Sequence, residues 1–188
     1  MSGPTISPGV VATNRDTLAI ARITARRGRT AALTDTVRKR FGVELPDGPR
    51  RIQASELAFI GVGVATWLAT TESDLDGFAT VLRTAVDDSA TVSDQIGSYG
   101  VLRLTGHRVR DVLAKFVALD LHARVFAPGS AATTLASHIP LTLWRLEDSS
   151  HGLAAFELAV PRSYATEFWH LLTESAAEFG FERAAAAG

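Results

Sequence analysis

The stretch RIQASELAFIGVGVATWLATTESDLDGFATVLRTAV, residues 51–86, contains the signals of two strands and a helix in succession. Apolar and β-branched residues dominate Ile52–Ile60 and Val64–Thr70, as is typical of strands. The glycines of Gly61-Val62-Gly63, between the two runs, predict a tight hairpin that needs positive φ. Two neighbouring antiparallel strands are therefore expected here.

The same stretch predicts a helix that begins at Ser73. The Ser73 hydroxyl can cap the helix, and Asp76 lies three residues further on. Apolar side chains recur at helical spacing after this point, so that one face of the helix is buried. That face comprises Leu75, Phe78, Leu82, Ala85 and Val86.

The flanking residues extend this unit in both directions. Leu18–Ala25 alternates as a strand does, and Thr30–Phe41 carries apolar side chains at helical spacing, at Leu33, Val37 and Phe41. A further strand is expected at Thr91–Ile96. The order strand, helix, strand, strand, helix, strand is that of a ferredoxin-like lobe.

The second half of the chain predicts another set of strands and helices. Glu157 is expected to face outward from its strand, while Ala154, Phe156, Leu158 and Val160 face the core. The expected strands are Val101–Thr105, Ala132–His138, Leu141–Leu146 and Leu153–Val160, and the expected helices are His107–Phe116 and Ser163–Phe179.

These elements predict an α+β protein of two small lobes. Residues 15–98 form the ferredoxin-like lobe, and residues 99–183 form a second α+β lobe that packs on the first. Residues 1–14 and 184–188 are expected to be flexible.

Charge is unevenly distributed along the chain. Residues 15–51 hold ten basic and four acidic residues, a local net charge of +6, although the whole chain has a net charge of −1. Such an excess raises nucleic-acid binding as an alternative. RNA recognition by a ferredoxin-like sheet needs aromatic residues on its central strands, and Leu18–Ala25 has none. No nucleic-acid partner is therefore expected.

The chain has no cysteine, which excludes disulfides, thiolate metal sites and thiol nucleophiles. Its first 16 residues lack the basic-then-apolar layout of a signal peptide. No apolar run approaches the roughly 20 residues that cross a bilayer. We expect a cytoplasmic protein with no membrane partner.

No group of residues in the sequence predicts a catalytic, cofactor or metal site. Gly61 and Gly63 lack the third glycine of a dinucleotide fingerprint, because Thr66 occupies that place. The five histidines show no helical metal-site spacing, and no Gly-x-Ser-x-Gly elbow is present. The chain is expected to perform no chemistry of its own.

Between Thr91 and Phe179 the sequence resembles the gamma subunit of heterotetrameric sarcosine oxidase. The order and spacing of several short motifs carry this resemblance together. They are SDQ (Ser93–Gln95), LRLTGHRVRDVLAK (Leu102–Lys115), LDLH (Leu119–His122), FAPG (Phe126–Gly129), LTLWR (Leu141–Arg145), VPRSYA (Val160–Ala165) and FWHLL (Phe168–Leu172).

The resemblance implies a non-catalytic subunit whose fold is related to part of the folate-binding aminomethyltransferase fold. Its partners would be the alpha, beta and delta subunits of the same oxidase. Those partners would carry FAD, FMN, NAD and tetrahydrofolate. The assembly would convert sarcosine, oxygen and tetrahydrofolate to glycine, hydrogen peroxide and methylene-tetrahydrofolate. The alternative is a stand-alone folate-binding or aminomethyltransferase-like protein.

Two loops are the candidate partner interface, because they combine charged and aromatic residues without a partner nearby in the sequence. They are Leu119–Gly129 and the turn Pro161–Ser163 before the last helix. The candidate interface residues are Asp120, His122, Arg124, Phe126 and Arg162.

Overall fold

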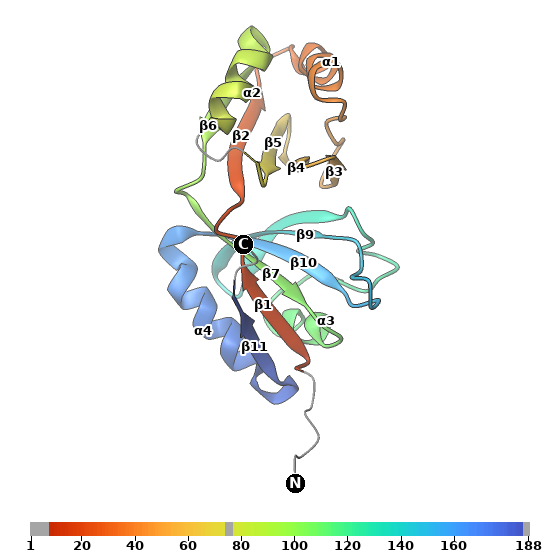
Figure 1. The fold of residues 1–188 in the computed structure, drawn as a ribbon, viewed down its shortest axis with the longest axis vertical. Coiled ribbons are helices and arrows are strands. Elements are labelled where there is room, and N and C mark those ends of the chain that lie inside the picture. Colours follow the sequence, from red (N-terminus) through yellow and green to blue (C-terminus); the bar gives the residue numbers. More distant parts are fainter. Residues whose placement is uncertain (1–7, 74–76, 186–188) are drawn as a thin grey trace. The chain divides into compact units, whose positions relative to one another are not determined.

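A computed structural model describes residues 8–73 and 77–185, which divide into two compact units, each with its own sheet (Figure 1). The ferredoxin-like lobe comprises Asp16–Tyr99 and Gly129–Thr133. The second lobe comprises the residues up to Arg15, Gly100–Pro128 and the residues from Thr134 onward. Each lobe therefore contains segments that are distant in the sequence, whereas the expected boundaries at residues 98 and 183 describe each lobe as one continuous segment.

The ferredoxin-like lobe has a five-stranded sheet in the order β3-β4-β5-β2-β6. The strand pairs β2·β5, β2·β6, β3·β4 and β4·β5 are antiparallel. Without the edge strand β3, the order of elements and strands is the ferredoxin-like one, as the sequence predicts. The elements are β2 (Ala19–Ala25), α1 (Thr30–Phe41), β3 (Arg51–Ala54), β4 (Leu57–Gly63), β5 (Thr66–Thr71), α2 (Phe78–Val86) and β6 (Ala90–Asp94).

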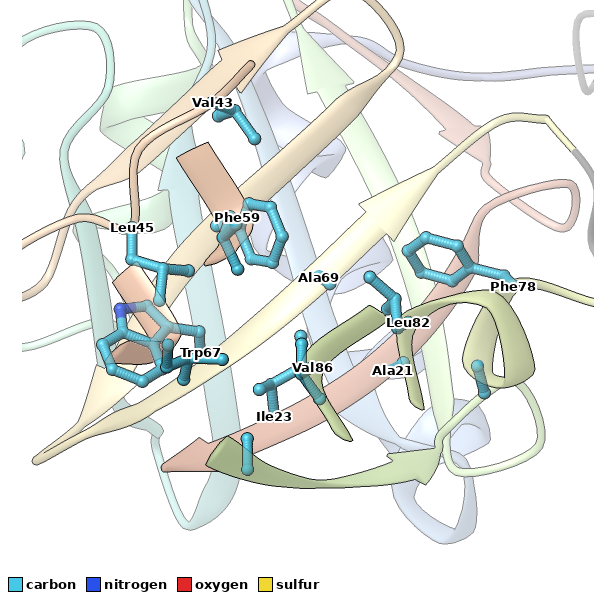
Figure 2. Close-up of a cluster of buried hydrophobic side chains, with 14 of the residues drawn as sticks. Ala21, Ile23, Val43, Leu45, Phe59, Trp67, Ala69, Phe78, Leu82 and Val86 are labelled. Atoms are coloured by element: carbon cyan, nitrogen blue, oxygen red, sulfur yellow. The ribbon is translucent and has the colours of Figure 1, made fainter. Parts of the chain in front are cut away.

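Both helices of this lobe contribute to one apolar core. Leu33 and Val37 of α1 lie in the same buried cluster as Phe78 and Leu82 of α2, which confirms the expected packing. Figure 2 shows strand residues of this cluster together with side chains of α2. The labelled members are Ala21, Ile23, Val43, Leu45, Phe59, Trp67, Ala69, Phe78, Leu82 and Val86.

The expected strand Ile52–Ile60 is instead a hairpin of β3 and β4. The chain turns at Ser55, whose φ of 54° is left-handed, so the strand cannot continue through it. The next turn, between β4 and β5, is made by Val64 and Ala65 and not by the two glycines.

Gly61 and Gly63 both lie within β4, and neither has positive φ. A Cβ atom on Gly61 would lie 2.0 Å from the carbonyl oxygen of Gly48. The expectation that these glycines form the hairpin turn with positive φ was therefore wrong for both. Close approach of another backbone segment, and not turn geometry, favours glycine at position 61.

Helix α2 begins at Phe78, later than the expected start at Ser73. The Ser73 hydroxyl does not cap it, because Ser73 lies before the N-cap position, and its hydroxyl donates a hydrogen bond to the carboxylate of Glu56 in the β3–β4 turn. Gly77 occupies the N-cap position and forms no side-chain cap. Leu75 and Asp76, expected in this helix, lie outside the described residues.

The second lobe has a six-stranded sheet in the order β11-β1-β7-β10-β9-β8. Its helices are shorter than expected, since the last one is preceded and followed by single 3-10 turns. The elements are β1 (Val10–Asn14), β7 (Tyr99–Thr105), α3 (Val109–Leu113), β8 (Ala131–Ala136), β9 (Ile139–Arg145), β10 (Ala155–Pro161), α4 (Ala165–Ala176) and β11 (Phe181–Ala184).

The two ends of the described chain are part of this sheet. Strand β1 pairs with β7 on one side and in parallel with β11 on the other, where Val10 lies opposite Phe181. Val10 and Ala12 are fully buried. The expectation that all of residues 1–14 are flexible was therefore wrong for residues 10–14, and β11 includes Ala184, the first residue of the expected flexible tail.

Strand β10 is buried along nearly its whole length, on both faces. Glu157 is only 2% exposed, so the expectation that it faces outward was wrong. Alternation predicts one solvated face, but a central strand of a covered sheet has none.

Candidate partner interface

The loop Leu119–Gly129 is held against the second lobe by two of its apolar side chains and one hydrogen bond. Leu121 and Phe126 are buried. The Nε of Arg110, on α3, donates a hydrogen bond to the carbonyl oxygen of Leu121 at 3.0 Å. The residues between these two anchors are consequently displayed at the surface.

Three of the candidate residues come together in one hydrogen-bonded turn. The backbone N–H of His122 donates to Oδ1 of Asp120 at 2.9 Å, and the N–H of Arg124 donates to Nδ1 of His122 at 3.3 Å. The carbonyl oxygen of His122 accepts from the N–H groups of Val125 and Phe126, at 2.9 and 2.8 Å. We call Asp120–Val125 the display turn.

Phe126 differs from the other candidates because it belongs to the core. It is 8% exposed, and its ring stacks on that of Phe156 with centroids 6.2 Å apart. The guanidinium groups of Arg145 and Arg110 lie 4.9 and 5.9 Å from the same Phe156 ring. Phe126 therefore fixes the end of the display turn and presents little surface to a partner.

Arg162 is exposed and lies on a different segment, at the start of the 3-10 turn that leads from β10 into α4. It is not part of the display turn. Sequence reasoning also missed Val125, whose side chain is 63% exposed at the end of that turn. The sequence signal for Val125 is its position, because this β-branched apolar residue lies between two candidate residues, Arg124 and Phe126.

The second lobe also contains a buried polar cluster, which we call the Glu157 cluster. Four strands position it: Arg15 directly follows β1, Arg103 lies on β7, Trp144 on β9 and Glu157 on β10. Oε1 of Glu157 accepts from Nε of Arg15 at 3.2 Å and from Nη2 of Arg103 at 2.6 Å. Oε2 accepts from Nε1 of Trp144 at 2.7 Å.

These hydrogen bonds favour a structural role for the Glu157 carboxylate over a catalytic one. Both oxygens of the carboxylate accept strong hydrogen bonds, and the Nε of Arg103 adds another to Oε1 at 3.0 Å. A buried carboxylate is stable only when it is paired in this way. A carboxylate with both oxygens engaged by fixed protein donors is poorly placed to take a proton from a substrate. Sequence reasoning missed the cluster, although single charges inside apolar strands were its signal.

The remaining sequence hypotheses find no built site in the described residues. Within residues 8–73 and 77–185, no group of three or more His, Asp or Glu side chains could hold a metal ion. His138 lies in the β8–β9 turn and pairs with Glu167 at 2.7 Å, both exposed. No helix of the described chain is long and apolar enough to cross a membrane.

The fold resembles two solved structures. The heterotetrameric sarcosine oxidase from Corynebacterium sp. U-96, in complex with pyrrole 2-carboxylate, aligns with a TM-score of 0.79 at 24% identity, over 93% of this chain and 87% of that chain. The glycine cleavage system aminomethyltransferase T from Bartonella henselae aligns with a TM-score of 0.66 at 11% identity. That alignment covers 94% of this chain and 48% of the enzyme.

The fold thus defines an α+β protein that corresponds to about half of an aminomethyltransferase, as the resemblance implied. The model of the sarcosine oxidase gamma subunit family matches residues 27–178. The chain belongs to this family. The match begins well before Thr91, so the first half of the chain shares the family's sequence pattern and not only its order of elements. No significant match was found among curated protein sequences.

Proposed function

We propose that this chain is the gamma subunit of a heterotetrameric sarcosine oxidase and that it acts in assembly, not in chemistry. The family match over residues 27–178 carries the proposal. In that assembly the alpha, beta and delta subunits would hold FAD, FMN, NAD and tetrahydrofolate. They would convert sarcosine, oxygen and tetrahydrofolate to glycine, hydrogen peroxide and methylene-tetrahydrofolate in the cytoplasm.

Co-purification from the host tests this proposal. A tagged full-length chain should co-purify with larger subunits of the oxidase. The visible absorption spectrum of the purified assembly should contain flavin bands. The chain purified alone should have none. Flavin bound to the lone chain at stoichiometric level, or recovery of the chain without any larger subunit, would contradict the proposal.

We further propose that the display turn and Arg162 contact a larger subunit. His122, Arg124 and Val125 are exposed, and the backbone of their turn is already held by Leu121, Phe126 and its own hydrogen bonds, so binding requires little further ordering of the backbone. Arginine is one of the residues that are enriched among interface anchors.

Alanine variants test the interface. Arg124→Ala is expected to weaken association with the larger subunits by about 1–3 kcal/mol if Arg124 is an anchor. Arg27→Ala serves as the control, since Arg27 is an exposed arginine of the other lobe. If Arg124→Ala and Val125→Ala both bind the larger subunits with wild-type affinity, the interface does not include the display turn. Phe126→Ala is unsuitable, because it removes a core side chain.

A further inference from the structure

The helices of the ferredoxin-like lobe form a groove on the side away from their buried residues. Its volume is about 580 Å³. We propose that this groove binds an acidic segment of one of the larger oxidase subunits. The proposal rests on the proposed function, which supplies the identity of the partner. The lining residues are Thr36, Lys39 and Arg40 of α1 and Thr80, Val81, Thr84 and Ala85 of α2.

The α2 side of the groove is apolar or neutral. Val81 is 50% exposed, although the neighbouring apolar residues Phe78, Leu82 and Val86 of the same helix are buried. A β-branched side chain gives no advantage to an exposed helix position. Local helix stability therefore does not explain Val81, whereas burial under a partner side chain would.

The α1 side of the groove is positively charged. Arg38, which lies next to the groove residues in sequence, pairs with Asp35 at 2.5 Å and with Glu44 at 3.8 Å. Lys39 and Arg40 form no ion pair with any residue of 8–73 or 77–185. Among the described residues, the lining contains no carboxylate. The two cations thus face neutral side chains across the groove.

The helix dipole explains only part of this pattern. The partial negative charge at the C-terminal end of α1 stabilises cations in its last turn, where Arg38, Lys39 and Arg40 lie. It does not account for an exposed valine on the opposite wall. An acidic partner segment accounts for both features, because its carboxylates would pair with Lys39 and Arg40 while an apolar side chain covers Val81.

The groove is suited to a protein segment better than to nucleic acid. Single strands are held by aromatic side chains on which bases stack, and the lining contains none. A groove of this size holds a few side chains, as ligand pockets of about 300–1,000 Å³ do. A stable interface buries about 800 Å² on each partner, so the groove would be one contact among several.

Charge reversal in the full chain tests the groove. Association of Lys39→Glu/Arg40→Glu with the purified larger subunits is measured at low and at high salt. We expect association at low salt at least about tenfold slower than for the wild type, with a weaker salt dependence. In a second variant, Val81→Asp, we expect faster dissociation, because a carboxylate would face the acidic segment.

Arg26→Glu/Arg27→Glu is the matched control. It changes the net charge equally, at exposed positions before the first residue of α1, whereas Lys39 and Arg40 lie in its last turn. The twelve residues of α1 span about 18 Å. The control should bind the larger subunits nearly as fast as the wild type. If reversal at Lys39 and Arg40 unfolds the chain, the glutamine variants Lys39→Gln/Arg40→Gln provide the same comparison.

Three results would overturn the proposal. The two charge reversals could slow association equally, which would indicate a general charge effect. The groove variants could bind the larger subunits as the wild type does. Finally, the wild-type chain could bind RNA, and the groove variants could lose this RNA binding while they keep subunit binding. That result would assign the groove to nucleic acid. If the wild-type chain binds no larger subunit, the proposed function fails too, and that result is distinct from the other three.

Discussion

The two lobes are stabilised in different ways. The ferredoxin-like lobe buries a cluster made of apolar side chains from both helices and four strands. The second lobe buries, among its apolar residues, a carboxylate that joins residues on or beside four strands, with Arg15 and Glu157 separated by 142 positions. An apolar core loses stability in proportion to the surface removed, whereas a buried ion cluster loses most of its benefit when a single partner is removed.

The largest effect is therefore expected for Glu157→Gln. The substitution keeps the side-chain size but removes the buried negative charge that pairs with the guanidinium of Arg15, which should lower the free energy of unfolding by about 4 kcal/mol. Urea denaturation of the full chain measures this change. Glu167→Gln, which removes an exposed partner of His138, should cost less than about 1 kcal/mol. Equal costs for the two variants would show that the Glu157 cluster contributes no more than a surface pair.

A somewhat smaller loss is expected for Leu82→Ala in the ferredoxin-like lobe. Leu82 is fully buried between α2 and the sheet, and its truncation should cost about 3 kcal/mol. Hydrogen exchange should show faster exchange in β2 and β5 for this variant, but in β9 and β10 for Glu157→Gln. The neighbouring exposed Val81→Ala should leave the free energy of unfolding nearly unchanged. Equally faster hydrogen exchange throughout both lobes in either variant would contradict the proposed difference between the lobes.

Gly61→Ala should cost about 2 kcal/mol, because its Cβ would overlap the carbonyl oxygen of Gly48 and force the backbone to move. Gly63→Ala is the matched control in the same strand. The nearest atom to a Cβ there is the Cβ of Thr66, at an ordinary contact distance of 3.8 Å. Thermal unfolding of the two variants should separate them clearly. Similar melting temperatures for the two variants would contradict the explanation that close backbone approach favours glycine at position 61.

The smallest of these contributions is the hydrogen bond that Trp67→Phe removes, which should cost about 1 kcal/mol in addition to the cost of the smaller side chain. Nε1 of Trp67 donates a hydrogen bond to the carbonyl oxygen of Pro46 at 2.9 Å, and phenylalanine leaves that buried acceptor unpaired. Denaturant unfolding checks this value. A loss of stability no greater than that expected from the smaller side chain alone would contradict this prediction.

The sequence predicts the ferredoxin-like lobe well because its signals are local. The apolar spacing in Thr30–Phe41 identifies α1, and the placement of Leu33 and Val37 follows from that spacing alone. The strand boundaries were less accurate, because turns at Ser55 and Ala65 use left-handed backbone without glycine. Left-handed backbone is uncommon at residues other than glycine, and serine and alanine are not among the residues enriched there.

The missed features depend on contacts between distant segments. Strand β1 is short, and it is ordered by pairing with two distant strands, β7 and β11, the second about 170 positions away. Glu157 fits an outward position by alternation, and the cluster that buries it requires the fold to be known. The display turn was located in part, since Asp120, His122 and Arg124 lie within five residues of sequence, whereas the inward direction of Phe126 depends on Phe156.

Native mass spectrometry of the assembly purified from its host tests whether this chain is a flavin-free subunit of a larger oxidase. We expect one complex that contains a single copy of this chain with the larger subunits, with every flavin mass retained by the larger subunits when the complex is dissociated. A chain that is found alone or only with copies of itself, or that carries a flavin after dissociation, would show that it is not such a subunit.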